Sequence, residues 1–236
     1  MTQFNVMLLE DEARVMTDTL GVRRNGQTAI IQKTDDLPGA VLVGRGGDWF
    51  FTELARLVHD SDLVGFDAIT DNLKDLAWQA MIPRIDAMRD QLGRGTREDV
   101  ANMARALAYQ RDADVAWAID YQLIVTGYSE REGTMLAAVS GFVEDDVQIL
   151  RPPNIAGGQY EVLVRFVEAI GGVPSIEQQA DALRLQYEAD IQLATDNGFP
   201  VDPVNVGGGD IELTRITPDG AITRENLGRL VQEAVA

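Results

Sequence analysis

Residues 2–9, TQFNVMLL, and residues 14–19, RVMTDT, decide the interpretation of this chain. Both stretches are rich in apolar and β-branched side chains, which favour strands, and the acidic segment EDEA lies between them. A short polar segment between two strand-like stretches is typical of a turn. The sequence therefore predicts a β-hairpin that begins at the start of the chain.

Two further strands are predicted before any helix. They fit residues 28–33 and 40–44, and the turn signal DDLPG separates them at residues 35–39. Beyond the glycine cluster at residues 44–47 the apolar spacing becomes helical. The helices predicted there cover residues 49–58, residues 68–92 with Pro83 as a kink or an end, and residues 101–109.

The second half of the chain predicts strands, then helices, then strands again. The strands are expected at residues 115–127, 133–140 and 147–150, with a closing pair around residues 211–216 and after the turn at residues 218–220. The two helices between them are predicted at residues 157–170 and 175–196. Ser175 and Gln178 have the spacing of a capping box at the start of the second one.

This order of elements predicts an α+β fold. Two antiparallel sheets with helices outside them would bury the inner faces of both sheets, which gives a four-layer αββα sandwich. The length of 236 residues and the hydrophobic content of 45% suit one large domain over residues 1–236 better than two small ones.

The composition is acidic, with 38 Asp and Glu against 20 Lys and Arg and a formal net charge of -18. Because this surface repels polyanions, we expect no nucleic-acid partner, and the charge by itself indicates only good solubility. No stretch is apolar over the roughly 18 residues of a membrane span, and the first residues lack the pattern of a signal peptide. We therefore expect a cytoplasmic protein with no membrane partner.

Cysteine is absent and the only histidine is His59. Thiol nucleophiles, disulfides, thiolate metal sites and multi-histidine metal sites are thereby excluded, and we expect neither a metal nor a cofactor. His59 lies in a helix-like stretch of alternating charge, so we expect a solvated residue rather than the base of a serine–histidine triad.

The element order resembles that of proteasome β-type subunits and related bacterial proteasome-like peptidases, which are N-terminal-nucleophile (Ntn) hydrolases. After processing, those enzymes begin with threonine, followed sixteen positions later by aspartate; a lysine comes from a following strand, and a glycine ends the strand before the first helix. Thr2 and Asp18 are sixteen positions apart here, and Lys33 and Gly47 keep the family's interval of fourteen. Lys33 and Gly47 each lie one position closer to Thr2 than in the family. A one-residue deletion near residues 24–26 explains both differences.

The resemblance implies that Thr2 becomes the nucleophile once Met1 is removed. A threonine hydroxyl needs a base, and an α-amino group with a pKa of about 7.7 to 8.0 supplies one on the same residue. The small side chain of Thr2 permits removal of Met1 by methionine aminopeptidase, and no propeptide is visible, so we expect no autolytic step.

The other matched residues have roles that the chemistry explains. Lys33 would stabilise the alkoxide, Asp18 would hold Lys33 by a charge-assisted hydrogen bond, and the backbone N–H of Gly47 would donate to the oxyanion. Each residue taken alone is more often structural: a turn aspartate, a surface lysine, a glycine between strand and helix. Their joint spacing within this element order carries the hypothesis.

The C-terminal half departs from the family pattern. The family has an aspartate and a serine, three positions apart and followed by paired glycines, which approach the threonine amine. The nearest match is Asp202 with Asn205, followed after one residue by Gly207 and Gly208. A second family serine, at the start of the helix after the second hairpin, is replaced by Gly157. We expect these positions to support the site by tuning the amine.

Two functions stay open at this point. The first is a threonine-type peptidase or amidase that acts through an acyl-enzyme on peptides or unfolded proteins, inside a homo-oligomeric ring served by an ATP-driven unfoldase. The second is a catalytically silent proteasome-like protein with a structural or assembly role in a ring, shell or virion. The helical faces at residues 49–58 and 73–88 are candidates for subunit contacts or for intramolecular core.

Overall fold

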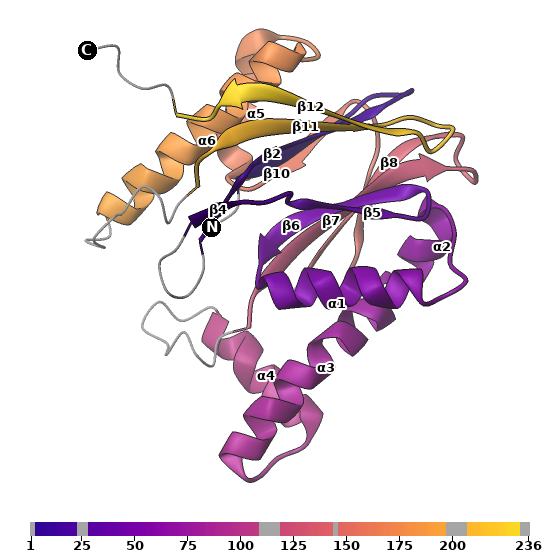
Figure 1. Ribbon diagram of the computed structural model, residues 1–236, viewed down its shortest axis with the longest axis vertical. Coiled ribbons are helices and arrows are strands. Elements are labelled where there is room, and N and C mark those ends of the chain that lie inside the picture. Colours follow the sequence, from indigo (N-terminus) through magenta and orange to yellow (C-terminus); the bar gives the residue numbers. More distant parts are fainter. Residues whose placement is uncertain (1–2, 23–27, 109–118, 144–145, 197–206, 232–236) are drawn as a thin grey trace.

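The computed structural model describes residues 3–22, 28–108, 119–143, 146–196 and 207–231 (Figure 1). The strands are β1 (Phe4–Leu8), β2 (Ala13–Asp18), β3 (Leu20–Val22), β4 (Thr28–Ile30), β5 (Thr34–Leu37), β6 (Ala40–Gly46), β7 (Tyr121–Ser129), β8 (Thr134–Gly141), β9 (Gln148–Leu150), β10 (Asn154–Gly157), β11 (Asp210–Ile216) and β12 (Ile222–Arg229). The helices are α1 (Asp48–His59), α2 (Phe66–Asp71), α3 (Leu73–Leu92), α4 (Arg97–Ala108), α5 (Tyr160–Ile170) and α6 (Ile176–Asp196).

Most of these strands form two five-stranded sheets. The first has the order β10-β1-β2-β11-β12 and the second has the order β5-β6-β7-β8-β9. Neighbouring strands are antiparallel in both sheets, and β3 and β4 form a separate antiparallel pair. The predicted α+β class with antiparallel sheets is confirmed.

Alternation along the strands decides what each face contacts, because successive side chains point to opposite sides of a strand. Phe4, Val6 and Leu8 of β1 share a buried cluster with residues of β6, β7 and β8, so the two sheets face each other there. Met7 instead shares a cluster with α5 and α6. The other face of the second sheet packs against α1 to α4, which lie together below that sheet in Figure 1.

The predicted turn at residues 35–39 is largely strand. Thr34–Leu37 forms β5, which pairs with β6, and only Pro38 and Gly39 make the turn. Thr34 and Leu37 are buried in this ladder. The sequence of β5, TDDL, is more polar than is typical of a strand, and for that reason it favours a turn.

The helix predicted over residues 68–92 is two helices, α2 and α3, separated at Asn72. Pro83 lies inside α3 and does not end it. The apolar stripes of α1 and α3 are buried against the second sheet, so the faces at residues 49–58 and 73–88 mainly form intramolecular core.

The start of α6 is as predicted. The backbone N–H of Ser175 donates to Gln178 Oε1 over 2.9 Å, and the N–H of Gln178 donates to Ser175 Oγ over 3.2 Å. This reciprocal pair is a capping box, which satisfies backbone donors that have no partner within the helix.

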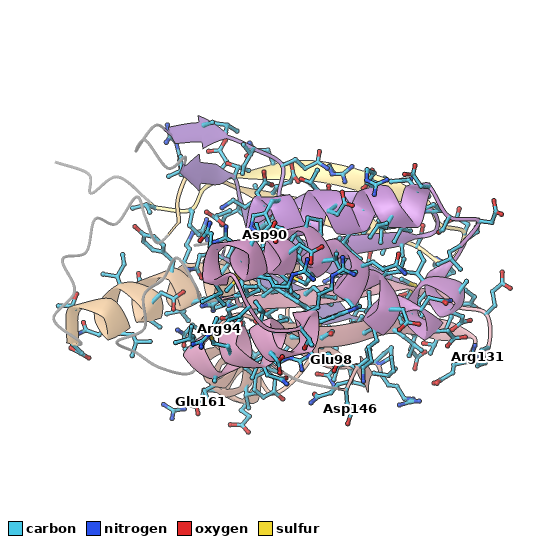
Figure 2. The ribbon with its side chains drawn as sticks, turned by 90° about the horizontal axis from the view of Figure 1, so that it is seen from below. Asp90, Arg94, Glu98, Arg131, Asp146 and Glu161 are labelled. Carbon is cyan, nitrogen blue, oxygen red and sulfur yellow. The ribbon has the colours of Figure 1, made fainter. Side chains whose placement is uncertain are left out.

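Charged side chains lie mostly on the outside. Figure 2 shows Asp90 on α3, Arg94 in the loop after it and Glu98 on α4, with Arg131 toward one end of the molecule. All four residues are exposed. Among the described helices, none combines the length and the apolar character that a membrane crossing requires.

Candidate active site

Asp18 is the centre of a buried polar site at the end of β2. Its side chain is 0% exposed, and three donors surround the carboxylate. Oδ1 accepts hydrogen bonds from Lys33 Nζ over 2.7 Å and from the backbone N–H of Gln3 over 2.8 Å. Oδ2 accepts one from the backbone N–H of Gly208 over 3.0 Å. The predicted partnership of Asp18 and Lys33 is therefore present in the structure.

The β3–β4 pair returns the chain to this place. Leu20 of β3 lies opposite Ile30 of β4, and the backbone N–H of Ile31 then donates to Thr19 O over 2.8 Å. This bond places the chain just before Lys33 next to the end of β2. The side chain of Lys33 is only 6% exposed and ends on Asp18.

The two charges at this site stabilise each other against burial. Burial raises the pKa of the Asp18 carboxyl, while the Lys33 charge and the hydrogen bonds from Lys33, Gly208 and Gln3 oppose that rise. Burial lowers the pKa of the Lys33 ammonium, and Asp18 opposes that fall. Because each charge is out of water, each one depends on the other to stay ionised.

The paired glycines of the C-terminal half approach the same carboxylate. A β-carbon on residue 207 would lie 3.1 Å from Asp18 Oδ2 and 3.0 Å from Gln3 Cγ, closer than a side chain ordinarily packs. A glycine at 207 lets the backbone approach closely enough for Gly208 to donate to Asp18. Asp202 and Asn205, which precede these glycines, lie outside the described residues.

Gly47 occupies the predicted place between strand and helix. It is the N-cap residue of α1 and follows β6 directly. In the β5–β6 ladder Thr34 lies opposite Val43. Lys33, one residue earlier, therefore lies toward the C-terminal end of β6, and Gly47 directly follows that end. The first backbone N–H groups of a helix have no partner within the helix and are available to an anionic oxygen.

Gly157 does not lie at the start of a helix, and that prediction is wrong. It ends β10, opposite Asn5, and α5 begins only at Tyr160. A β-carbon at position 157 would lie 2.4 Å from Phe4 O, so the close approach of β10 to β1 leaves no room for a serine. Thr2 lies outside the described residues, which begin with Gln3.

Comparison with solved structures relates the fold to Anbu proteins. Anbu (ancestral beta-subunit) from Yersinia bercovieri matches with a TM-score of 0.61 and 8% identity over 97% of this chain and 87% of that chain. Anbu from Hyphomicrobium sp. strain MC1 gives 0.57 and 10% over 97% and 88%. The helical assembly of the Anbu complex from Pseudomonas aeruginosa gives 0.57 and 14% over 100% and 88%. This chain has an Anbu-like fold.

One of these structures is named as an ancestral beta-subunit, which agrees, at the level of the fold alone, with the resemblance to proteasome β-type subunits inferred from the sequence. No protein-family model and no curated protein matches the sequence. At identities of 14% and below, the comparisons show the shared fold alone.

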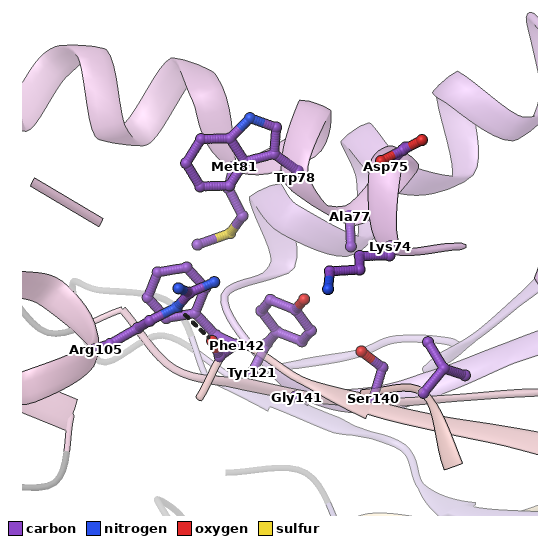
Figure 3. Close-up of a pocket in the computed structure, with 11 residues that line it drawn as sticks. Lys74, Asp75, Ala77, Trp78, Met81, Arg105, Tyr121, Ser140, Gly141 and Phe142 are labelled. Atoms are coloured by element: carbon purple, nitrogen blue, oxygen red, sulfur yellow. Dashed lines mark hydrogen bonds between the residues drawn. The ribbon is translucent and has the colours of Figure 1, made fainter. Parts of the chain in front are cut away.

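A cavity of about 160 Å³ lies elsewhere in the Anbu-like fold, between α3, α4 and the second sheet (Figure 3). Lys74, Trp78 and Tyr121 line it, and Arg105 Nε donates to Phe142 O over 3.0 Å at its edge. Burial raises the pKa of the Tyr121 hydroxyl, against a hydrogen bond with Ser140. Tyr121 belongs to the cluster between the second sheet and its helices, and neither Asp18 nor Lys33 lines this cavity.

The sequence prediction missed a group of buried polar residues beside the site. Gln3 and Asn5 of the N-terminal segment contact residues of α6, and the signal was their alternation with apolar residues in a strand that is otherwise hydrophobic. On the helix, Gln179 and Gln186 are seven positions apart, which places them on one face.

Proposed function

We propose that this protein is a threonine-type peptidase or amidase of the Ntn class, with residues 1–236 forming one αββα sandwich. The observation that supports the proposal is the buried Asp18–Lys33 pair, which also holds the backbone N–H of Gln3. Gln3 directly follows Thr2 in the sequence. The residue proposed as nucleophile is thus joined by one peptide bond to a residue whose N–H binds the same carboxylate as Lys33.

In the proposed reaction, removal of Met1 frees the amine of Thr2. The amine takes the hydroxyl proton as Thr2 Oγ1 attacks the substrate carbonyl, and the N–H of Gly47 stabilises the oxyanion. Collapse of the tetrahedral intermediate expels the protonated leaving amine and leaves an ester on Thr2. Water, deprotonated by the amine, hydrolyses that ester. Lys33 lowers the free energy of the alkoxide, Asp18 fixes Lys33, and Asp202 and Asn205 are proposed to tune the amine.

We also propose a homo-oligomer in the cytoplasm, acting on peptides or on unfolded proteins delivered by an ATP-driven unfoldase. The Anbu complex from P. aeruginosa is a helical assembly, which supports a helical or ring-shaped oligomer for this chain. The alternative is a catalytically silent assembly protein. The match of Asn205 to a serine of the family pattern favours that alternative, because asparagine has no hydroxyl.

Intact-mass measurement and chemical labelling test the proposal directly. The purified protein is expected to lack Met1 and to gain one equivalent of an electrophile that bonds both the amine and the hydroxyl of an N-terminal threonine. Peptide mapping is expected to place the adduct on Thr2, and prior acetylation of the amine should prevent it. Retained Met1, or no adduct on a chain that lacks Met1, would favour the silent alternative.

The pH dependence of kcat/KM is expected to be bell-shaped. The rate should rise as the amine loses its proton, at a pKa of about 7.7 to 8.0 in an unperturbed terminus. It should fall again where Lys33 loses its proton, and burial puts the pKa of Lys33 below its ordinary 10.5. Initial rates between pH 6 and pH 11, taken as roughly the range of these two groups, measure both limbs. A rate that stays level across both pKa values would contradict the assignment of Thr2 and Lys33.

A further inference from the structure

A stripe of buried polar side chains on α6 faces the N-terminal strand. Gln179, Gln186 and Asp190 are all buried and follow one another at spacings of seven and four, which puts them on one face of the helix. Gln3 and Asn5 are buried opposite them and, as alternate residues, point to the same side of the strand. At these positions the contacts between α6 and the N-terminal segment are polar, whereas Met7 of β1 shares an apolar cluster with Ala182 of α6.

Asp190 holds the side chain of the residue that follows Thr2. Its Oδ2 accepts a hydrogen bond from Gln3 Nε2 over 2.6 Å, and its Oδ1 accepts one from Gln159 Nε2. In the described part of the chain, no Lys or Arg forms an ion pair with Asp190. Burying a carboxylate is costly when its donors are neutral, and the donors to Asp190 within the described residues are the side-chain amides of Gln3 and Gln159.

Gln3 is thereby held at two points. Its side chain ends on Asp190, and its backbone N–H ends on Asp18, which also holds Lys33. That N–H belongs to the planar peptide unit that joins residues 2 and 3. These two contacts of Gln3 restrict the orientation of the peptide unit that joins residue 3 to residue 2.

We infer that Asp190 is a positioning residue, which acts through Gln3 to aim the hydroxyl and the amine of Thr2 at Lys33. The inference rests on the proposed function. Because Asp190 orients the nucleophile and does not bind the substrate, its loss should lower kcat and leave KM unchanged. Nothing in the resemblance to the proteasome family predicts this role, since it comes from the contacts of Gln3.

The same helix supplies a matched control. Gln179 Nε2 donates to Asn5 Oδ1 over 2.9 Å and to Arg14 O over 3.2 Å. These bonds also join α6 to the first sheet, but their partners are Asn5 of β1 and Arg14 of β2 instead of Gln3. Gln179→Leu therefore removes buried hydrogen bonds of the same kind without touching the residue next to Thr2.

The first measurement compares turnover of a small fluorogenic peptide by Asp190→Ala, Asp190→Asn and Gln179→Leu, each at a temperature where it is fully folded. Asp190→Ala is expected to lower kcat about 10- to 100-fold, the cost of misplacing a reacting group by about 1 Å. Asp190→Asn keeps one acceptor oxygen, and the glutamine amides can rotate to accept from its NH₂, so it should recover most of that loss. Gln179→Leu should keep the wild-type kcat, although it destabilises the fold.

The second measurement is the hydrogen-exchange rate of the Gln3 backbone amide, which needs no activity. Asp190→Ala should accelerate that exchange and Gln179→Leu should not. If the wild type turns over and Asp190→Ala keeps its kcat, or if exchange at Gln3 does not change, the inference is overturned while the proposed function stands. If the wild type forms no adduct at Thr2, the proposed function is wrong and so is the catalytic role of Asp190. The exchange rates then show only that Asp190 stabilises the structure around Gln3.

Discussion

Replacing Thr2 with alanine is expected to abolish turnover of small peptide substrates while the fold stays intact. The change removes the only oxygen that the proposed mechanism uses for attack, and loss of a nucleophile costs on the order of 10⁴-fold or more in kcat. Thermal unfolding should change little, because Thr2 precedes the described strands and only its hydroxyl is removed. Initial rates and a melting curve on the same preparation measure both effects.

Two further variants make this result specific. Thr2→Ser keeps a hydroxyl and an amine on one residue and is expected to retain measurable turnover. Thr52→Ala makes the same chemical change on the exposed face of α1 and should leave the rate unchanged. Equal activity of wild type and Thr2→Ala would end the proposal that Thr2 is the nucleophile, whatever the fold.

The predictable part of this fold comes from regular patterns. The alternation in β1 and β2 and the helical spacing in α1 and α3 indicate the elements, because each pattern places apolar residues on the one face that is buried. The capping box at Ser175 locates the start of α6 because its two hydrogen bonds are local. Interactions between near neighbours in the sequence are the ones that the sequence reveals.

The parts that could not be predicted depend on distant partners. β5 exists because β6 offers it a ladder, although its own sequence, TDDL, favours a turn. Gly157 belongs to a strand because β10 pairs with β1, more than a hundred residues away in sequence. In both cases tertiary pairing overrides local preference.

The candidate site likewise has a part that could be predicted from the sequence and a part that could not. The spacing of Asp18 and Lys33 predicted their contact because it could be compared with a known pattern of intervals. Asp190 has no such pattern, and its contact with Gln3 is visible only in the folded structure, where α6 lies against the N-terminal segment. From the sequence alone, an aspartate in a long amphipathic helix is predicted to be exposed, because Asp is seldom buried. Its burial is recognised only when the neighbouring strand is known.

Asp18→Asn is expected to destabilise the protein by about 3–5 kcal/mol, the cost of leaving a buried charge without its partner. The variant keeps the size of the side chain, but its neutral amide no longer balances the ammonium of Lys33, which is 2.7 Å from the carboxylate in the wild type. Burial already lowers the pKa of Lys33, and loss of Asp18 should lower it further, so the variant should regain part of its stability as the pH rises. Urea unfolding at several pH values measures the size and the sign of this effect.

Two controls test whether the loss of stability in Asp18→Asn comes from the burial of the pair or only from the loss of one charge. Asp36→Asn removes the partner of Arg224 at a site where the carboxylate side chain is 48% exposed, and exposed pairs contribute only about 0–1 kcal/mol. Asp18→Leu combined with Lys33→Met removes both buried charges and should be more stable than Asp18→Asn, yet inactive, because the proposed mechanism requires the cation of Lys33. If Asp18→Asn costs no more than Asp36→Asn, the Asp18–Lys33 pair is not the buried charge pair on which the proposed mechanism depends.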